Sequence, residues 1–216
     1  MYEVLVIFGK RRFGEVGKYC NIINTLIHEL GHALMSLILH GKVSKIQVFK
    51  DTSGVTTTGS DSKFKSILVS LAGYTFASAA ALCCFFLLSV GYEKWIIVGL
   101  SVTFLIILIF WIHNNWFGVA WVLAFILINV MLLYFWRNDS VTEAVAWIYS
   151  TIMLVESVWS TFELVHISVR TPEKAGDATK LHKFAYLPSL IWAVLFALFS
   201  IWMAYLSLVQ VHILPK

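Results

Sequence analysis

Two histidines and a glutamate lie close together in the segment HELGH, which runs from His28 to His32. On a helix, residues i and i+4 lie on the same face, so both imidazoles can bind one metal ion. Two histidines and one carboxylate form a catalytic zinc site with a fourth position open for water. Glu29 lies beside this site and is expected to act as general base toward the metal-activated water. The segment therefore predicts one Zn²⁺ per chain and a hydrolytic reaction.

The third ligand must come from another part of the chain, and three carboxylates are candidates. Asp177 lies in AGDATKLHKFAYLP, which indicates a short helix within a loop, where an aspartate is equally suited to cap the helix. Glu163 lies near the end of an apolar stretch, where it could instead be an interfacial carboxylate. Residue chemistry alone does not choose between Asp177 and Glu163. Glu156, which lies one or two turns deeper in the membrane, is a weaker candidate than either.

The composition of the chain is that of an integral membrane protein. Hydrophobic residues make up 59% of its 216 residues and charged residues 13%, and the mean hydropathy is +0.81. A soluble domain of this size carries about twice that share of charged residues. The formal net charge of +4 is small and spread over loops, which argues against a nucleic-acid partner. The lipid bilayer is the expected surrounding.

Six stretches of the chain are apolar enough to span a bilayer, for which a helix needs roughly 20 mainly apolar residues. They are residues 19–40, 67–90, 95–112, 116–136, 141–168 and 186–213. The first, which contains HELGH, is the least hydrophobic. We expect an all-α polytopic (multi-pass) membrane protein with about six transmembrane helices. An N-terminal extramembrane segment, 1–18, would precede a single membrane domain, 19–213.

The two longest loops, 41–66 and 170–184, lie on the same side of the membrane in this topology. In the first loop, residues 43–49 and 55–58 have β-branched and aromatic side chains and flank the turn signal DTSG. This pattern predicts a small membrane-associated β-hairpin directly after the first helix. The side of the hairpin carries nine lysines and arginines and the other side seven, so charge alone does not choose the orientation.

The hairpin is also the expected binding site of a substrate, because an unwound peptide gains new backbone partners by pairing with a strand edge. The expected contact positions are Val43, Ile46, Val48, Val55 and Thr57. Asn114 and Asn115 are further candidates for binding the substrate or an oxyanion. Simple loop polarity at an interface is the commoner reason for such a pair.

Several stretches in the right order resemble the site-2 protease class of intramembrane zinc metalloproteases, and more narrowly the short B-like branch of metallopeptidase family fifty. HELGHALMSLILHGKVSKI (28–46) resembles the zinc helix and the following strand, and SGVTTT (53–58) resembles the second strand of the family's hairpin. LAGYTFASAAA (71–81) resembles the second core helix with its small-residue face. NNWFG (114–118) and GDATKLHKFAYLPSLIWA (176–193) resemble two later motifs. The resemblance covers most of residues 20–205.

The resemblance implies an endopeptidase that cleaves a transmembrane or juxtamembrane bond of a membrane-protein substrate. It also implies a carboxylate ligand delivered by a later membrane segment. Better-studied members use an L-D-G motif there, and Gly176-Asp177-Ala178 is the nearest match, which favours Asp177. The zinc is expected near the cytoplasmic face, and the plasma membrane is the default location.

Three alternatives fit parts of the same pattern. A catalytically silent metalloprotein could regulate membrane partners by binding them, although it would have no reason to keep Glu29. A small transporter or channel could use Glu29, Glu156, Glu163 and His166 along its path. A membrane zinc protease of another class would take a glutamate such as Glu163 as its third ligand.

Overall fold

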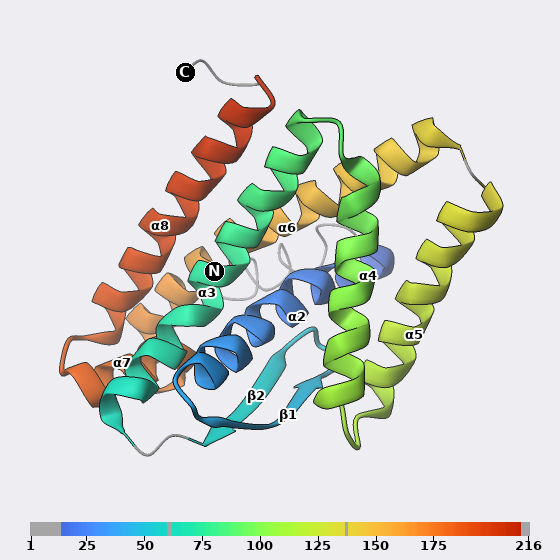
Figure 1. Cartoon of the computed structure of the whole chain (residues 1–216). Coiled ribbons are helices and arrows are strands. Elements are labelled where there is room, and N and C mark those ends of the chain that lie inside the picture. Colours follow the sequence, from blue (N-terminus) through green and yellow to red (C-terminus); the bar gives the residue numbers. More distant parts are fainter. Residues whose placement is uncertain (1–13, 60–61, 137, 213–216) are drawn as a thin grey trace.

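The structure is a computed structural model that describes residues 14–59, 62–136 and 138–212 (Figure 1). Within these residues the chain forms long helices and one two-stranded antiparallel sheet, which confirms the expected all-α fold with a small hairpin. The elements follow in the order α2 (Gly14–Ile38), β1 (Lys42–Val48), β2 (Gly54–Gly59), α3 (Lys63–Ser89), α4 (Glu93–Phe110), α5 (Trp116–Val130), the π-helix η1 (Met131–Trp136), α6 (Asp139–Arg170), the 3-10 turn η2 (Pro172–Lys174), α7 (Gly176–Ala185) and α8 (Ser189–Gln210).

Five helical spans in the described part of the chain are long and apolar enough to cross a membrane. They are α3, α4, α5 continued by η1, α6 and α8, which correspond to the last five of the six expected stretches. Helix α2 has 25 residues, or about 37 Å at 1.5 Å per residue, and is long enough as well. It is not among the five, because Asn24, Thr25 and the HELGH segment interrupt its apolar sequence.

Two expected boundaries differ at the ends of the chain. Residues 1–13 of the expected N-terminal segment lie outside the described residues, whereas residues 14–18 already belong to α2. The last helix begins at Ser189 instead of Tyr186. Tyr186 ends α7 in a left-handed conformation, and Pro188 then starts α8 as its N-cap. The expected end of that helix, Ile213, lies outside the described residues.

Helix α2 lies in the middle of the molecule, enclosed by its neighbours (Figure 1). Helices α3 and α6 pack against it, and both strands of the hairpin lie along it. Small residues allow close approach between α2 and α3. A Cβ atom on Gly31 would lie 2.7 Å from the carbonyl oxygen of Ala72 and 2.7 Å from Cβ of Phe76. Such small-residue contacts are typical of packed membrane helices, and they hold α2 and α3 in a fixed relation.

The hairpin is fastened to α2 at two points. Strands β1 and β2 pair antiparallel, with Ile46 opposite Thr56. The hydroxyl of Thr25 donates to the carbonyl oxygen of Thr52 in the turn at 2.9 Å, and the hydroxyl of Thr56 donates to the backbone carbonyl oxygen of Glu29 at 3.1 Å. These two bonds fix the position of β2 along α2, directly beside the HELGH segment.

The outer edge of β1 is covered by the connection between α4 and α5. The backbone N–H of Ile46 donates to the carbonyl oxygen of Trp111 at 2.9 Å, and Nδ2 of Asn115 donates to the carbonyl oxygen of Val48 at 3.0 Å. An edge strand otherwise presents a row of unpaired backbone groups. Strand β1 is therefore held between β2 and this connection.

Candidate metal centre

Helix α2 places the two histidines of HELGH side by side. The Nε2 atoms of His28 and His32 are 3.1 Å apart, and the rings meet edge to face with centroids 4.7 Å apart. Residues i and i+4 of a helix are neighbours on its surface, which explains the proximity. Both rings thus direct the same nitrogen atom toward one point.

Helix α3 fixes the orientation of these rings. Nδ1 of His32 is 2.7 Å from the carbonyl oxygen of Val69, which can only accept, so Nδ1 carries the proton and donates. The lone pair of the neutral ring is then on Nε2, as metal binding requires. Gly73 lies against both rings. A Cβ atom there would be 2.5 Å from Cε1 of His28 and 2.6 Å from Cε1 and Nε2 of His32. Tyr74 packs edge-on against His28 with centroids 4.5 Å apart.

Helix α7 brings Asp177 to the same point. Its Oδ2 atom lies 3.3 Å from Nε2 of His28 and 3.1 Å from Nε2 of His32. Lys180 donates to the other oxygen, Oδ1, at 3.0 Å. Burial alone would raise the pKa of the Asp177 carboxyl, but His32 and His28 outweigh it and hold that pKa well below its usual range. Asp177 is therefore an anion that faces both imidazoles.

A tight turn before α7 delivers this aspartate. After the 3-10 turn Pro172–Lys174, Gly176 has a φ of +48°, a conformation that glycine adopts without steric cost. The hydroxyl of Thr179 donates to the carbonyl oxygen of Pro172 at 2.6 Å and closes the turn. Asp177 consequently lies in the first helical turn of α7 with its side chain buried.

The rival carboxylates lie elsewhere, on α6. Glu163 is exposed and Glu156 is half-buried. Within the described residues, one group of three or more histidine, cysteine, aspartate or glutamate side chains is placed to hold a metal ion. It consists of His28, His32 and Asp177, whose ligand atoms all lie within 4.8 Å of one another. The structure thus brings Asp177, and not Glu163, to the two histidines.

The three ligand atoms fit a tetrahedral zinc ion by their spacing. Bonds of about 2.0–2.1 Å in a tetrahedral arrangement place neighbouring ligand atoms about 3.3 Å apart. The observed separations between the two Nε2 atoms and Oδ2 are 3.1, 3.1 and 3.3 Å. The donors are two imidazoles and one carboxylate, a set that zinc binds in catalytic sites. One tetrahedral position is left for a water molecule or a substrate.

A cavity of about 650 Å³ opens at this centre. It is bounded by α2, by residues 54–58 of β2, by the first turns of α3 and by α7, and it is lined by all three ligand residues. Glu29 lines it as well and is 5% exposed. A Cβ atom on Gly54 would lie 2.7 Å from Cγ and Oε1 of Glu29, so β2 lies directly against this carboxylate. The arrangement places a carboxylate base, a metal-ligand set and a strand around one space.

The expected substrate-binding positions divide between the cavity and the core. Val55 and Thr57 are exposed on β2 and line the cavity. Ile46 and Val48 are fully buried, because the alternation of side chains along β1 turns both into the core. Val43 is half-buried and does not line the cavity. The structure therefore brings only the β2 positions to the site.

The two asparagines are placed outside the cavity. Asn114 is exposed and has a φ of +55° in the turn before α5. Asn115 is buried, and both ends of its amide are engaged. Oδ1 accepts from the N–H of Gly118 at 2.6 Å as the N-cap of α5, and Nδ2 donates to Val48. These contacts give Asn115 a structural role in holding β1.

Gly73, Gly54 and Lys180 are among the residues of the site that were not singled out in the sequence. Gly73 and Gly54 allow the side chains of the site to approach their backbones closely. A single sequence does not reveal such contacts between distant segments. Gly73 lies in the small-residue stretch LAGYTFASAAA, and this stretch indicates helix packing without naming the partner. Lys180 stands three residues after Asp177, a spacing that allows an ion pair on a helix. That spacing was the available signal.

One of three comparisons with known proteins gave a match. The family described as Peptidase M50B-like matches residues 1–207 of the chain. The comparisons with curated proteins and with solved structures gave no match.

Proposed function

Because the chain belongs to the Peptidase M50B-like family and is therefore a membrane metallopeptidase, we propose that it is a zinc-dependent intramembrane endopeptidase. The substrate would be a membrane protein, cut at a transmembrane or juxtamembrane bond. One observation carries the proposal. His28, His32 and Asp177 present three ligand atoms at zinc spacing in a cavity that Glu29 also lines.

The three ligand residues would hold the zinc ion through Nε2 of both histidines and Oδ2 of the aspartate. When bound, zinc supplies a Lewis acid that polarises the scissile carbonyl and lowers the pKa of water. The protein's part is to keep this centre rigid. Val69 holds the His32 tautomer through its carbonyl oxygen, and the close approach of Gly73 keeps both rings in place. Such outer contacts tune the affinity of ligands for a metal.

Glu29 is the proposed general base. It would take a proton from the attacking water and pass it to the nitrogen of the leaving amine. Its carboxylate is nearly buried, and Gly54 leaves just enough room for it beside β2. The hydroxyl of Thr56 fixes the backbone of Glu29 from the same strand. A substrate held along β2 would therefore lie next to this base.

Strand β2 is the proposed docking edge for the substrate. A helical substrate hides its carbonyl groups in intrahelical hydrogen bonds, so the cleaved segment must unwind and find other partners. Residues 54–58 line the cavity, whereas the outer edge of β1 is covered by Trp111 and Asn115. Pairing of an extended segment with β2 would satisfy its backbone groups. The side chains of Val55 and Thr57 would then contact the substrate.

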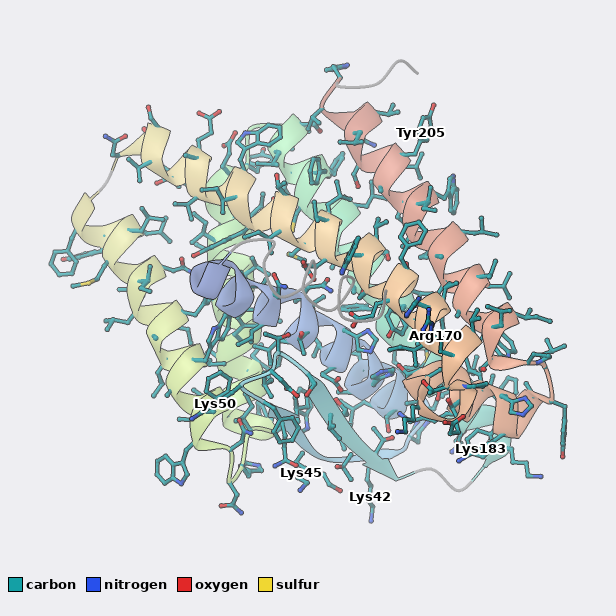
Figure 2. The ribbon with its side chains drawn as sticks, turned by 180° about the vertical axis from the view of Figure 1, so that it is seen from behind. Lys42, Lys45, Lys50, Arg170, Lys183 and Tyr205 are labelled. Atoms are coloured by element: carbon teal, nitrogen blue, oxygen red, sulfur yellow. The ribbon has the colours of Figure 1, made fainter. Side chains whose placement is uncertain are left out.

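The hairpin end is proposed to face the cytoplasm, with the plasma membrane as the location. Figure 2 shows Lys42, Lys45, Lys50, Arg170 and Lys183 toward that end of the molecule, while Tyr205 lies at the other end. Basic residues are enriched in cytoplasmic loops, and the nine lysines and arginines on this side against seven on the other agree with this orientation without deciding it. An impermeant thiol reagent applied to intact cells is expected to label a His212→Cys variant, which lies just beyond the end of α8, above the wild-type background. It should label Lys45→Cys only after permeabilisation, and the reverse pattern would invert the orientation.

The function is tested by comparing membranes that contain the wild-type chain with membranes that contain Glu29→Gln. New protein N-termini are enriched and identified by mass spectrometry. We expect termini within or beside transmembrane segments that depend on the wild-type chain and disappear in the variant. Zinc content is measured on both purified proteins and should be equal, because Gln replaces a residue that is not a ligand.

Two results would count against the proposal. Wild-type termini that persist in Glu29→Gln would end the role of Glu29 as base. If the folded wild-type protein binds no zinc when zinc is supplied in excess, the proposed metal centre is wrong. Equal zinc content in the two proteins excludes loss of the metal as the reason for lost cleavage.

A further inference from the structure

We infer that Lys180 is a positioning residue of the metal centre, which holds the Asp177 carboxylate so that a single oxygen is presented to the metal ion. The inference rests on the proposed zinc site. It goes beyond the ligand set and the base, because Lys180 touches neither the metal position nor the peptide bond in the proposed mechanism.

The two oxygens of Asp177 have different partners. Oδ2 faces Nε2 of His28 at 3.3 Å and Nε2 of His32 at 3.1 Å, whereas Oδ1 accepts from Nζ of Lys180 at 3.0 Å. A free carboxylate can bind a metal ion through one oxygen or through both. The bond from Lys180 occupies Oδ1, so the carboxylate offers Oδ2 alone. A zinc ion held by this oxygen and by the two histidines would keep its fourth position for water.

The contact between Lys180 and Asp177 is formed within one helix. Asp177 lies in the first turn of α7 and Lys180 follows three residues later, so both side chains lie on one face of the same short helix. The Asp177 side chain is 7% exposed and that of Lys180 is 58% exposed. The ammonium group therefore reaches a buried carboxylate from the cavity side, which Lys180 lines.

The expected size of the effect comes from the behaviour of outer contacts in metal sites. Loss of a hydrogen bond to a ligating residue typically weakens metal binding by about 10- to 100-fold. Lys180→Met removes the donor and keeps the length of the side chain. Lys180→Arg keeps a charged donor. Lys183→Met is the matched control, because Lys183 is an exposed lysine on the same helix.

The experiment measures the zinc dissociation constant of the four purified proteins by competition with a chelating dye. We expect about a 10- to 100-fold increase for Lys180→Met, and values within about threefold of wild type for Lys180→Arg and Lys183→Met. Visible absorption of the cobalt-loaded proteins gives a second readout. Tetrahedral Co²⁺ absorbs more strongly than Co²⁺ of higher coordination number, so a carboxylate freed to bind through both oxygens should weaken the absorption of Lys180→Met.

The outcomes separate this inference from the proposed function. If the wild-type chain binds no zinc, the metal centre and the role of Lys180 fall together. If the wild type binds zinc and Lys180→Met binds it equally well with the same cobalt spectrum, only the role of Lys180 is overturned. A lower thermal unfolding temperature of Lys180→Met with unchanged zinc affinity would likewise assign the lysine to stability alone.

Discussion

Replacing Gly73 by alanine tests the geometry of the centre most directly. The added Cβ would lie 2.5 Å from Cε1 of His28 and 2.6 Å from Cε1 of His32. Carbon atoms in contact are about 3.5–4.0 Å apart, so the rings would have to move by about 1 Å. His32 is held on its other nitrogen by Val69, which belongs to the same helix as Gly73. The ring therefore cannot withdraw without losing that hydrogen bond.

We expect Gly73→Ala to lose much of its cleavage activity, although the substitution adds only one methyl group. Metal sites tolerate ligand displacements of about 0.2 Å, and a misplacement of 1 Å in a reacting group can cost about 100-fold in rate. We expect Gly73→Ala to lower the cleavage rate by about that factor, or about 2.7 kcal/mol of transition-state stabilisation. Zinc affinity should fall as well. Both are measured on purified protein, with dye competition for zinc and a peptide derived from an identified substrate for cleavage.

Gly99→Ala is the matched control. Gly99 lies on α4, where an added Cβ meets no other atom within 4 Å. Alanine is favoured over glycine within a helix by about 0.5–1 kcal/mol, so this variant should be at least as stable as wild type and equally active. Wild-type zinc affinity and cleavage in Gly73→Ala would show that the two histidines do not hold a metal ion in the observed arrangement.

Three further predictions concern the same centre. Asp177→Asn should lose the bound zinc while Glu163→Gln keeps about one zinc per chain by elemental mass spectrometry, and the opposite result would identify Glu163 as the ligand. Gly54→Ala places a Cβ 2.7 Å from Oε1 of Glu29, so cleavage should slow by about 10- to 100-fold at unchanged zinc content. Gly59→Ala on the same strand, where a Cβ meets nothing within 4 Å, should cleave normally. Adding zinc at about 100 times its dissociation constant to wild-type protein stripped of metal by a chelator should stabilise it against thermal unfolding by about 2.7 kcal/mol. The same addition should leave the stability of Asp177→Asn unchanged. Equal stabilisation of both proteins would contradict the role of Asp177 as a ligand.

The parts of this site that follow from local sequence could be predicted well. The spacing of His28 and His32 depends only on helix periodicity, and the hairpin depends on two short β-prone runs around a turn signal. The strands Lys42–Val48 and Gly54–Gly59 each begin and end within one residue of the expected runs, 43–49 and 55–58. Long apolar stretches likewise revealed the spanning helices, because the bilayer imposes their length.

The rest depends on how distant segments meet, which a single sequence does not encode visibly. Asp177 and Glu163 are equally suited by chemistry, and only the turn before α7 places Asp177 at the histidines. Ile46 and Val48 were expected at the substrate because alternation alone does not say which face of a hairpin is buried. The contact of Gly73 with two imidazoles exists only once α2 and α3 have packed.

The enclosed position of α2 has a consequence for how the protein is made. Its Glu29 would cost about 2.5–3.5 kcal/mol at the centre of a lone helix in lipid, and α2 is not among the helices apolar enough to insert alone. In the folded protein α3 and α6 pack against it, but residue 139, where α6 begins, follows residue 38 by 101 positions. At about 5–20 residues per second, the ribosome delivers that partner roughly 5–20 s later. The segment that carries the chemistry is thus the least apolar of the long helices described, and in the folded protein it is packed against helices that are synthesised after it.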